Sequence, residues 1–186
     1  MNNRDFLFNP NVRLFGEIGS GSFWDFMDQV AKVRETDNDA VVLELSTEGG
    51  DADVARRIAC EIRLCRQWHG RETHFVGKTY VYSAGVTIMA AVPRENRYLT
   101  EDTVMLVHER RLTKTIQIDG PMRSNIQILR EQLASVESAQ QIEKDGFAEL
   151  AEGSKISVDE LYDRATRNCY LTAREALDLE LIADII

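Results

Sequence analysis

The run from 41 to 45 most constrains the fold, because apolar residues fill it with almost no polar alternation. A parallel strand covered by helices on both faces has this pattern, whereas a half-exposed strand alternates. The segments on either side have the apolar spacing of amphipathic helices, at Phe23, Phe26, Met27, Val30 and Val33 before the run and at Val54, Ile58, Ile62 and Cys65 after it. A third strand is predicted at 74–76. This order predicts a parallel sheet with right-handed crossovers.

The other predicted elements complete one domain over residues 1–186. A first strand spans 12–18, and a polar stretch at 36–39 ends the first helix. Further strands are predicted at 96–99 and 103–107. Pro121 opens a long helix, because proline suits the first turn. Capping boxes beginning at Ser157 and Thr172 mark two short helices, and 181–186 is predicted to be a strand or a packed tail.

The composition excludes several classes of function. The chain has 186 residues and a net charge of -9, which argues against general binding to nucleic acid or anionic membranes. Three cysteines without a CxxC spacing indicate neither a disulfide framework nor a zinc site, so we expect no metal or cofactor and a reducing cytoplasm. No segment resembles a signal peptide or a membrane span.

Three candidate site residues each follow a predicted strand: Gly50, Ser83 and His108. Active sites of parallel sheets gather at the carboxyl ends of the strands, so these residues are expected to share one crevice. A serine nucleophile needs a base, here His108, and donors for the negative charge on the attacked oxygen, here the bare backbone of Gly49-Gly50. Taken alone, each has a structural explanation: Gly49-Gly50 would be a turn, Ser83 a helix cap and His108 a core histidine.

Four segments in this order resemble the proteolytic subunit of the Clp protease (ClpP): Glu48-Gly49-Gly50, Ser83-Ala84-Gly85, Met105 to His108, and Tyr170 to Ala176. The resemblance covers about Asn11 to Ile186. It implies an α/β fold of the ClpP/crotonase type, a repeated ββα/βαβ spiral with a protruding strand-helix handle at 109–150. It also implies that the backbone N–H groups of Gly50 and Ala84 form the oxyanion hole.

The long helix carries an apolar stripe with steps of four and three residues: Met122, Ile126, Leu129, Leu133 and Val136. The spacing alone fits equally well a helix that packs on its own sheet and one that meets a partner. The resemblance favours a handle through which two heptameric rings stack, and so a homo-oligomer. It also implies an ATP-dependent unfoldase as a further partner.

The sequence departs from the family at the third triad position, where Asn168 replaces the usual aspartate. An amide oxygen can hold the imidazole of His108 but lacks the charge that stabilises the imidazolium, and this exchange can cost about 10⁴-fold in turnover. Asp163 is the nearest carboxylate in sequence that could substitute. Glu48, and Glu109 with Arg110 after the histidine, also depart from the usual residues.

The sequence therefore predicts a cytoplasmic serine endopeptidase that cleaves short or unfolded polypeptides. Ser83 is the expected nucleophile, His108 the base and Asn168 the orienting residue. Two alternatives remain open. One is a catalytically inactive structural subunit of a Clp-type ring. The other is a crotonase-type acyl-CoA enzyme that uses the same Gly-Gly loop on a thioester.

Overall fold

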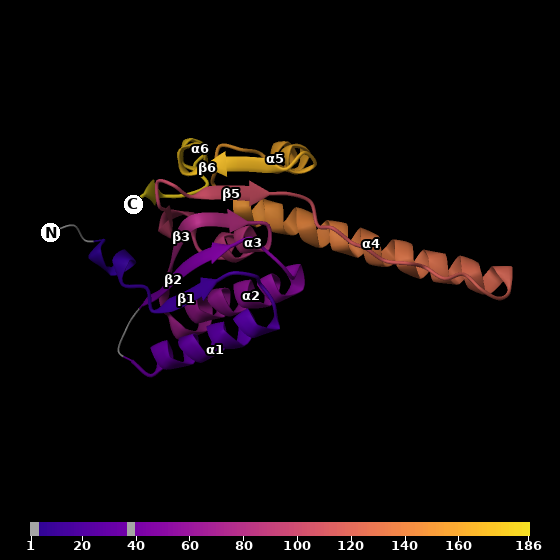
Figure 1. Ribbon diagram of the computed structural model, residues 1–186, viewed down its shortest axis with the longest axis horizontal. Coiled ribbons are helices and arrows are strands. Elements are labelled where there is room, and N and C mark those ends of the chain that lie inside the picture. The colour runs from indigo at the N-terminus through magenta and orange to yellow at the C-terminus, as the bar shows by residue number, and fades with distance from the viewer. Residues whose placement is uncertain (1–3, 37–39) are drawn as a thin grey trace.

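The computed structural model describes residues 4–36 and 40–186, and its strands form a single sheet (Figure 1). The sheet order is β1-β2-β3-β4-β7, and β5 pairs with both β3 and β6. The strands are β1 (Val12–Phe15), β2 (Ala40–Thr47), β3 (Glu72–Tyr82), β4 (Arg97–Leu99), β5 (Val104–Val107), β6 (Cys169–Thr172) and β7 (Asp184–Ile185).

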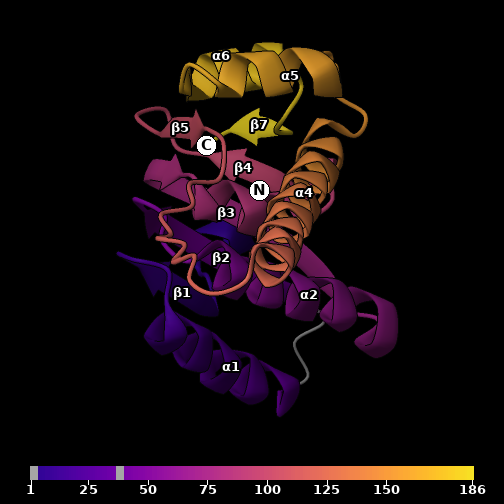
Figure 2. The ribbon, with the colours of Figure 1, turned by 90° about the vertical axis from the view of Figure 1, so that its right-hand side faces the viewer.

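The helices cover the sheet unequally. Figure 2 shows α1 (Ser20–Arg34) and α2 (Ala52–His69) along one side, and α5 (Val158–Ala165) and α6 (Ala173–Asp178) at the opposite end. The short α3 (Ala84–Ala90) packs against α2 and against α4 (Met122–Ala151). Two 3₁₀ turns, η1 (Asp5–Phe8) and η2 (Arg94–Asn96), complete the elements. None of the helices in the described ranges is long and apolar enough to span a bilayer.

The parallel sheet predicted from the sequence is confirmed. The pairs β1–β2, β2–β3, β3–β4 and β3–β5 are all parallel, and the buried helical positions include Phe26, Val30, Ile58 and Ile62. Both helix caps are confirmed, since Ser157 accepts from the N–H of Glu160 and Thr172 from that of Glu175. The reciprocal bond of a capping box forms at Thr172, whereas α5 has the Ser157 cap without it.

Several element boundaries differ from the prediction. The first strand ends at Phe15, and Ile18 instead forms an isolated bridge with Gly50. The third strand spans 72–82 rather than 74–76, so it continues directly to Ser83. The sequence did not indicate β6, which pairs antiparallel with β5. Part of the predicted break at 36–39, residues 37–39, lies outside the described residues.

The long helix projects from the body of the molecule, as Figure 1 shows for α4. Its apolar stripe is exposed at Met122, Ile126, Leu129, Leu133 and Val136. The strand that was expected to accompany it is not formed, and residues 109–120 are an irregular loop instead. A strand needs a hydrogen-bonding neighbour, and none of the strands within residues 4–36 and 40–186 pairs with that segment.

Candidate functional site

Ser83 stands at a sharp turn between β3 and α3. Its backbone has φ 53 and ψ -113, an outlying conformation for a non-glycine residue that costs on the order of 1–3 kcal/mol. The surrounding structure enforces the turn, since the Ser83 N–H donates to the carbonyl of Leu106 at 2.8 Å and Val86 N–H donates to the Ser83 carbonyl at 3.0 Å. Val81 and Ala84, on either side, are buried. These bonds therefore fix the backbone that carries the Ser83 hydroxyl.

The Gly-Gly loop lies directly against this turn. A β-carbon added to Gly49 would lie 2.8 Å from the β-carbon of Ser83, and one added to Gly50 would lie 2.8 Å from the backbone nitrogen of Ile18. Both glycines have positive φ, at 105 and 140, which glycine adopts at no steric cost. Thr47 fixes the loop from beneath: its hydroxyl donates to Gly16 O at 2.6 Å and accepts from Gly49 N–H at 3.0 Å.

Two backbone N–H groups are left without acceptors near Ser83. The bridge to Ile18 uses Gly49 O and Asp51 N–H, not the N–H of Gly50. Ala84 is the first residue of α3, where an N–H has no acceptor inside the helix. Within residues 4–36 and 40–186, neither N–H donates a hydrogen bond. Both are available to a developing oxyanion.

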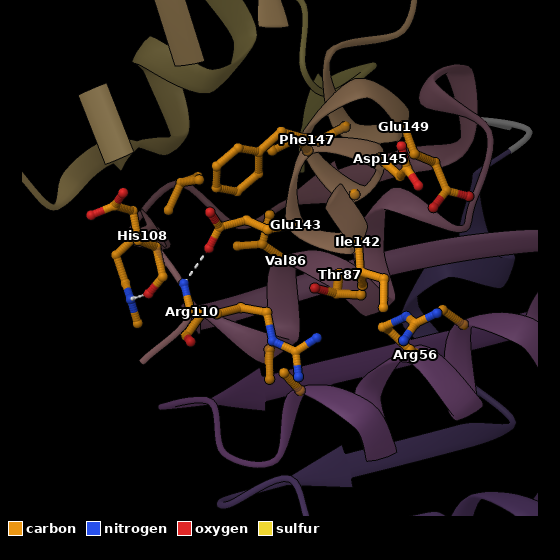
Figure 3. A pocket seen from close by; sticks show the side chains of 18 of the residues that line it. Arg56, Val86, Thr87, His108, Arg110, Ile142, Glu143, Asp145, Phe147 and Glu149 are labelled. Carbon is orange, nitrogen blue, oxygen red and sulfur yellow. Dashed lines mark hydrogen bonds between the residues drawn. The ribbon is translucent and has the colours of Figure 1, made fainter. Parts of the chain in front are cut away.

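A cavity of about 620 Å³ joins the predicted residues (Figure 3). Gly50, Ser83, Ala84 and His108 all line it, and α4 closes the far wall with residues including Ile142, Glu143 and Phe147. The structure thus brings together four of the five residues predicted from the sequence. In the described part of the chain, no group of three or more His, Cys, Asp or Glu residues could hold a metal ion.

His108 follows β5 and is half-buried in the cavity wall. Its Nδ1 lies 2.6 Å from the carbonyl oxygen of Glu109. Because a carbonyl can only accept, this contact requires the hydrogen on Nδ1 and leaves the Nε2 lone pair available to a proton. Among the described residues, no hydrogen bond joins His108 to the Ser83 hydroxyl.

Asn168, the fifth predicted residue, precedes β6 directly and lies outside the set of residues that line the cavity. β5 and β6 pair antiparallel, and their register ends at the pair Val107 and Cys169, which are the chain neighbours of His108 and Asn168. Asn168 is nevertheless exposed, has φ 59, and its side chain bonds to no other described residue.

Asp163 does not take the place of the missing aspartate either. Its carboxylate pairs with Arg167 at 3.0 Å on the exposed surface of α5. It lies outside the set of residues that line the cavity.

The segment after His108 is tied to two helices. The backbone N–H of Arg110 donates to the Glu143 carboxylate of α4, and the Arg110 guanidinium donates to Asp53 of α2 at 3.0 Å. Glu143 is 9% exposed. The sequence did not single out Glu143, because its position on the helix gives no sign that the loop folds back over it.

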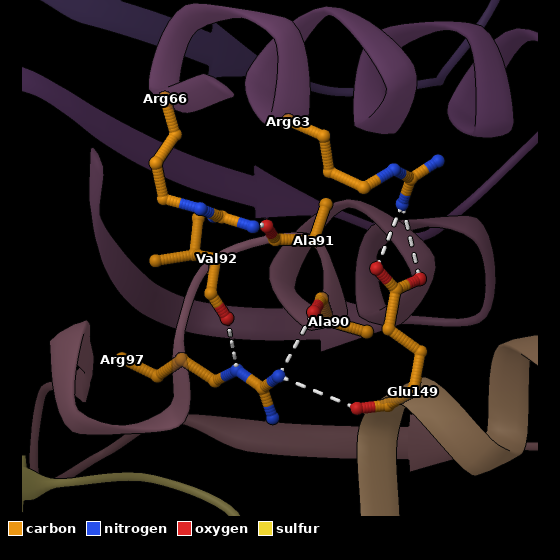
Figure 4. A network of polar contacts seen from close by, with 7 residues as sticks. All are labelled: Arg63, Arg66, Ala90, Ala91, Val92, Arg97 and Glu149. Atoms are coloured by element: carbon orange, nitrogen blue, oxygen red, sulfur yellow. Dashed lines mark hydrogen bonds and ion pairs between the residues drawn. The ribbon is translucent and has the colours of Figure 1, made fainter. Parts of the chain in front are cut away.

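A buried arginine supports the helix that follows Ser83. Arg97 donates to the carbonyl groups of Ala90 and Val92 at the end of α3, both at 2.8 Å, and to Glu149 of α4 (Figure 4). The acceptor on Glu149 is its backbone carbonyl oxygen. Arg97 is 3% exposed, and this burial lowers the pKa of its guanidinium to about 10. The positive charge also suits the carboxyl end of α3. A lone arginine beginning a short strand carries no sequence signal for this role.

The arrangement of repeated βα units around this cavity defines an α/β protein of the ClpP type. A family model described as Clp protease matches residues 4–186, and the chain therefore belongs to the Clp protease family. That family makes it a Clp-type protease or a ClpP-like subunit.

Two known proteins extend this comparison. The chain is similar to ATP-dependent Clp protease proteolytic subunit 2 of Pseudomonas aeruginosa, with 28% identity over 163 residues, which cover 87% of this chain and 73% of that protein. Its fold is similar to that of a ClpP1 mutant from Listeria monocytogenes, with a TM-score of 0.76 and 20% identity, covering 100% of this chain and 96% of that one.

Proposed function

We propose that the protein is a serine endopeptidase that hydrolyses short or unfolded polypeptides through an acyl-enzyme on Ser83. One observation carries the proposal: the strained Ser83 turn shares a cavity with His108 and with the unused N–H groups of Gly50 and Ala84. These are the nucleophile, base and donor pair that acyl transfer requires.

The chemistry follows from these positions. Ser83 Oγ attacks the peptide carbonyl carbon while Nε2 of His108 takes its proton. The N–H groups of Gly50 and Ala84 receive the negative charge on the carbonyl oxygen. The C–N bond then breaks, and the leaving amine takes the proton from His108. Water, deprotonated by the same imidazole, hydrolyses the ester and releases the carboxylic acid and Ser83.

Labelling with a fluorophosphonate, read by mass spectrometry of the intact protein and its peptides, tests this function. We expect one adduct, on Ser83, which disappears in Ser83→Ala and falls strongly in His108→Ala. Ser138→Ala is the matched control, since Ser138 is an exposed serine of α4 and its loss should leave labelling unchanged. A folded wild-type protein that stays unlabelled would contradict the proposal.

A non-catalytic ring subunit is the second candidate. It is favoured because the exposed Asn168 side chain bonds to no described residue and because Nδ1 of His108 bonds to the Glu109 carbonyl instead of to a carboxylate. This candidate predicts assembly without Ser83 labelling. A crotonase-type acyl-CoA enzyme would instead turn over a thioester after Ser83→Ala.

The exposed stripe on α4 supports a homo-oligomer of rings that stack through this helix. Light scattering measures the mass of the assembly. A charge placed on the stripe by Leu133→Glu should separate the stacked rings and so halve the mass found for the wild type.

We also propose a cytoplasmic location, which the free thiols of Cys60, Cys65 and Cys169 support. An ATP-dependent unfoldase is the proposed partner, by analogy with the Pseudomonas relative.

A further inference from the structure

Glu143 of α4 places a carboxylate in the wall of the cavity that His108 also lines. We propose that Glu143 orients His108 and stabilises its charged form, acting through the peptide group that joins Glu109 to Arg110. This inference rests on the proposed function, because it assigns a role in activating Ser83. Glu143 is a positioning residue here, since it acts through a peptide group and not on the reacting atoms.

Both ends of that peptide group are hydrogen-bonded. Its carbonyl oxygen, from Glu109, accepts from Nδ1 of His108 at 2.6 Å. Its N–H, from Arg110, donates to Oε2 of Glu143. Figure 3 shows the two bonds as dashed lines on either side of the loop, with Glu143 reaching in from α4. The imidazole, the peptide group and the carboxylate therefore form one continuous chain of hydrogen bonds.

The carboxylate of Glu143 is not used by a cation. None of the ion pairs between described residues includes it. Two arginines that line the cavity bond to other carboxylates, Arg63 to Glu149 at 2.8 Å and the Arg110 guanidinium to Asp53 at 3.0 Å. A carboxylate that is 9% exposed and unpaired is costly. Among the described residues, the Arg110 N–H is the hydrogen-bond donor that this carboxylate has.

A charged acceptor on the N–H side strengthens the acceptor on the carbonyl side, because hydrogen bonds in a chain polarise one another. The Glu109 oxygen then holds the Nδ1–H of His108 firmly and keeps the tautomer in which Nε2 accepts the Ser83 proton. When His108 becomes an imidazolium, the carboxylate charge at the end of the chain stabilises it. Asn168, which is neutral and exposed, does not supply that charge.

A double-mutant cycle tests the proposal on the full chain, with the rate of fluorophosphonate labelling at Ser83 as the readout. Glu143→Gln in the wild type should slow labelling about 10- to 100-fold, the range for an outer partner of an orienting group. The same change in Asn168→Asp should cost under about 3-fold, because the new aspartate supplies the charge directly and the two sites are coupled. Asn168→Asp would thus rescue Glu143→Gln, which a merely structural defect would not allow.

Glu137→Gln is the control, since it removes the same charge from an exposed position of α4 and should leave labelling unchanged. Thermal unfolding of every variant checks that it folds. Equal losses in the two backgrounds, or no loss in the wild type, would overturn the role of Glu143 while leaving the peptidase intact. A wild type that resists the probe altogether would instead refute the proposed function.

Discussion

The two sides of the cavity differ in how firmly they are built. On the side of Ser83, a continuous strand, a short buried helix and the bonds of Thr47 fix the backbone of the Ser83 turn and of the Gly-Gly loop. On the side of His108, the chain leaves β5 as a loop whose hold comes from Glu143 and Asp53. The backbone of the first side is fixed by bonds within the core, whereas the second side depends on the conformation of one loop.

Because of this difference, we expect changes on the His108 side to alter mainly the rate of Ser83 labelling. Changes on the Ser83 side should alter mainly the free energy of unfolding. A change that adds charge opposite His108 can raise the rate without altering the core. A change beneath the Gly-Gly loop must disturb buried polar groups, so it affects folding as well.

The largest expected effect comes from Asn168→Asp. A carboxylate opposite His108 competes with the Glu109 carbonyl for Nδ1–H and stabilises the imidazolium, so labelling of Ser83 should accelerate, by at most about 10⁴-fold. Thr166→Asp is the control, because it adds the same charge two residues away. If both aspartates have the same effect, general electrostatics explains the gain and Asn168 has no special position.

Gly50→Ala should have the next largest effect. Its β-carbon would approach Ile18 at a positive φ of 140, so the loop must move and its N–H leaves the oxyanion position. Loss of one such donor costs about 10²- to 10³-fold in rate. Gly21→Ala, where an added β-carbon meets nothing within 4 Å, should retain full activity. Peptide hydrolysis by the two variants measures the difference, and equal activity would remove Gly50 from the site.

Thr47→Val should have the smallest effect, and chiefly on stability. The change leaves the carbonyl of Gly16 and the N–H of Gly49 without their buried partner, which costs about 1–3 kcal/mol. Thr166→Val is the matched control, since its hydroxyl bonds to Asp163 O on the surface. Urea unfolding measures the free energy of unfolding of both variants. Equal decreases would show that the burial of Thr47 does not determine how much stability its hydroxyl contributes.

The sequence predicted those parts of the molecule that depend on local patterns. Uninterrupted apolar runs gave the parallel strands, and the residues after them gave Gly50, Ser83 and His108 in one cavity. Asn168 was predicted from the family resemblance, and its role stays a prediction, because its exposed side chain makes no hydrogen bond to another described residue. Periodicity and order were enough for the parallel α/β sheet, whereas the ClpP/crotonase type and the projecting helix came from the family resemblance.

What the sequence could not predict depends on contacts between distant segments. Glu143 and Arg110 are 33 positions apart, and neither belongs to a motif. The long reach of β3 and the short β6 are set by their sheet partners rather than by their own residues. The expected strand at 109–120 has a suitable alternation, but a strand also needs a partner, which one chain does not provide.

The positive φ at Ser83 costs the folded protein stability at the same position that carries the proposed nucleophile. An inert form made by Ser83→Ala would keep the strain, whereas Ser83→Gly would release it, on the order of 1 kcal/mol. The glycine form should therefore melt higher than the native protein although it has lost its hydroxyl. For experiments that need bound but uncleaved peptides, Ser83→Ala keeps the stability of the native protein. Ser83→Gly would give an inactive protein that is more stable than the native one.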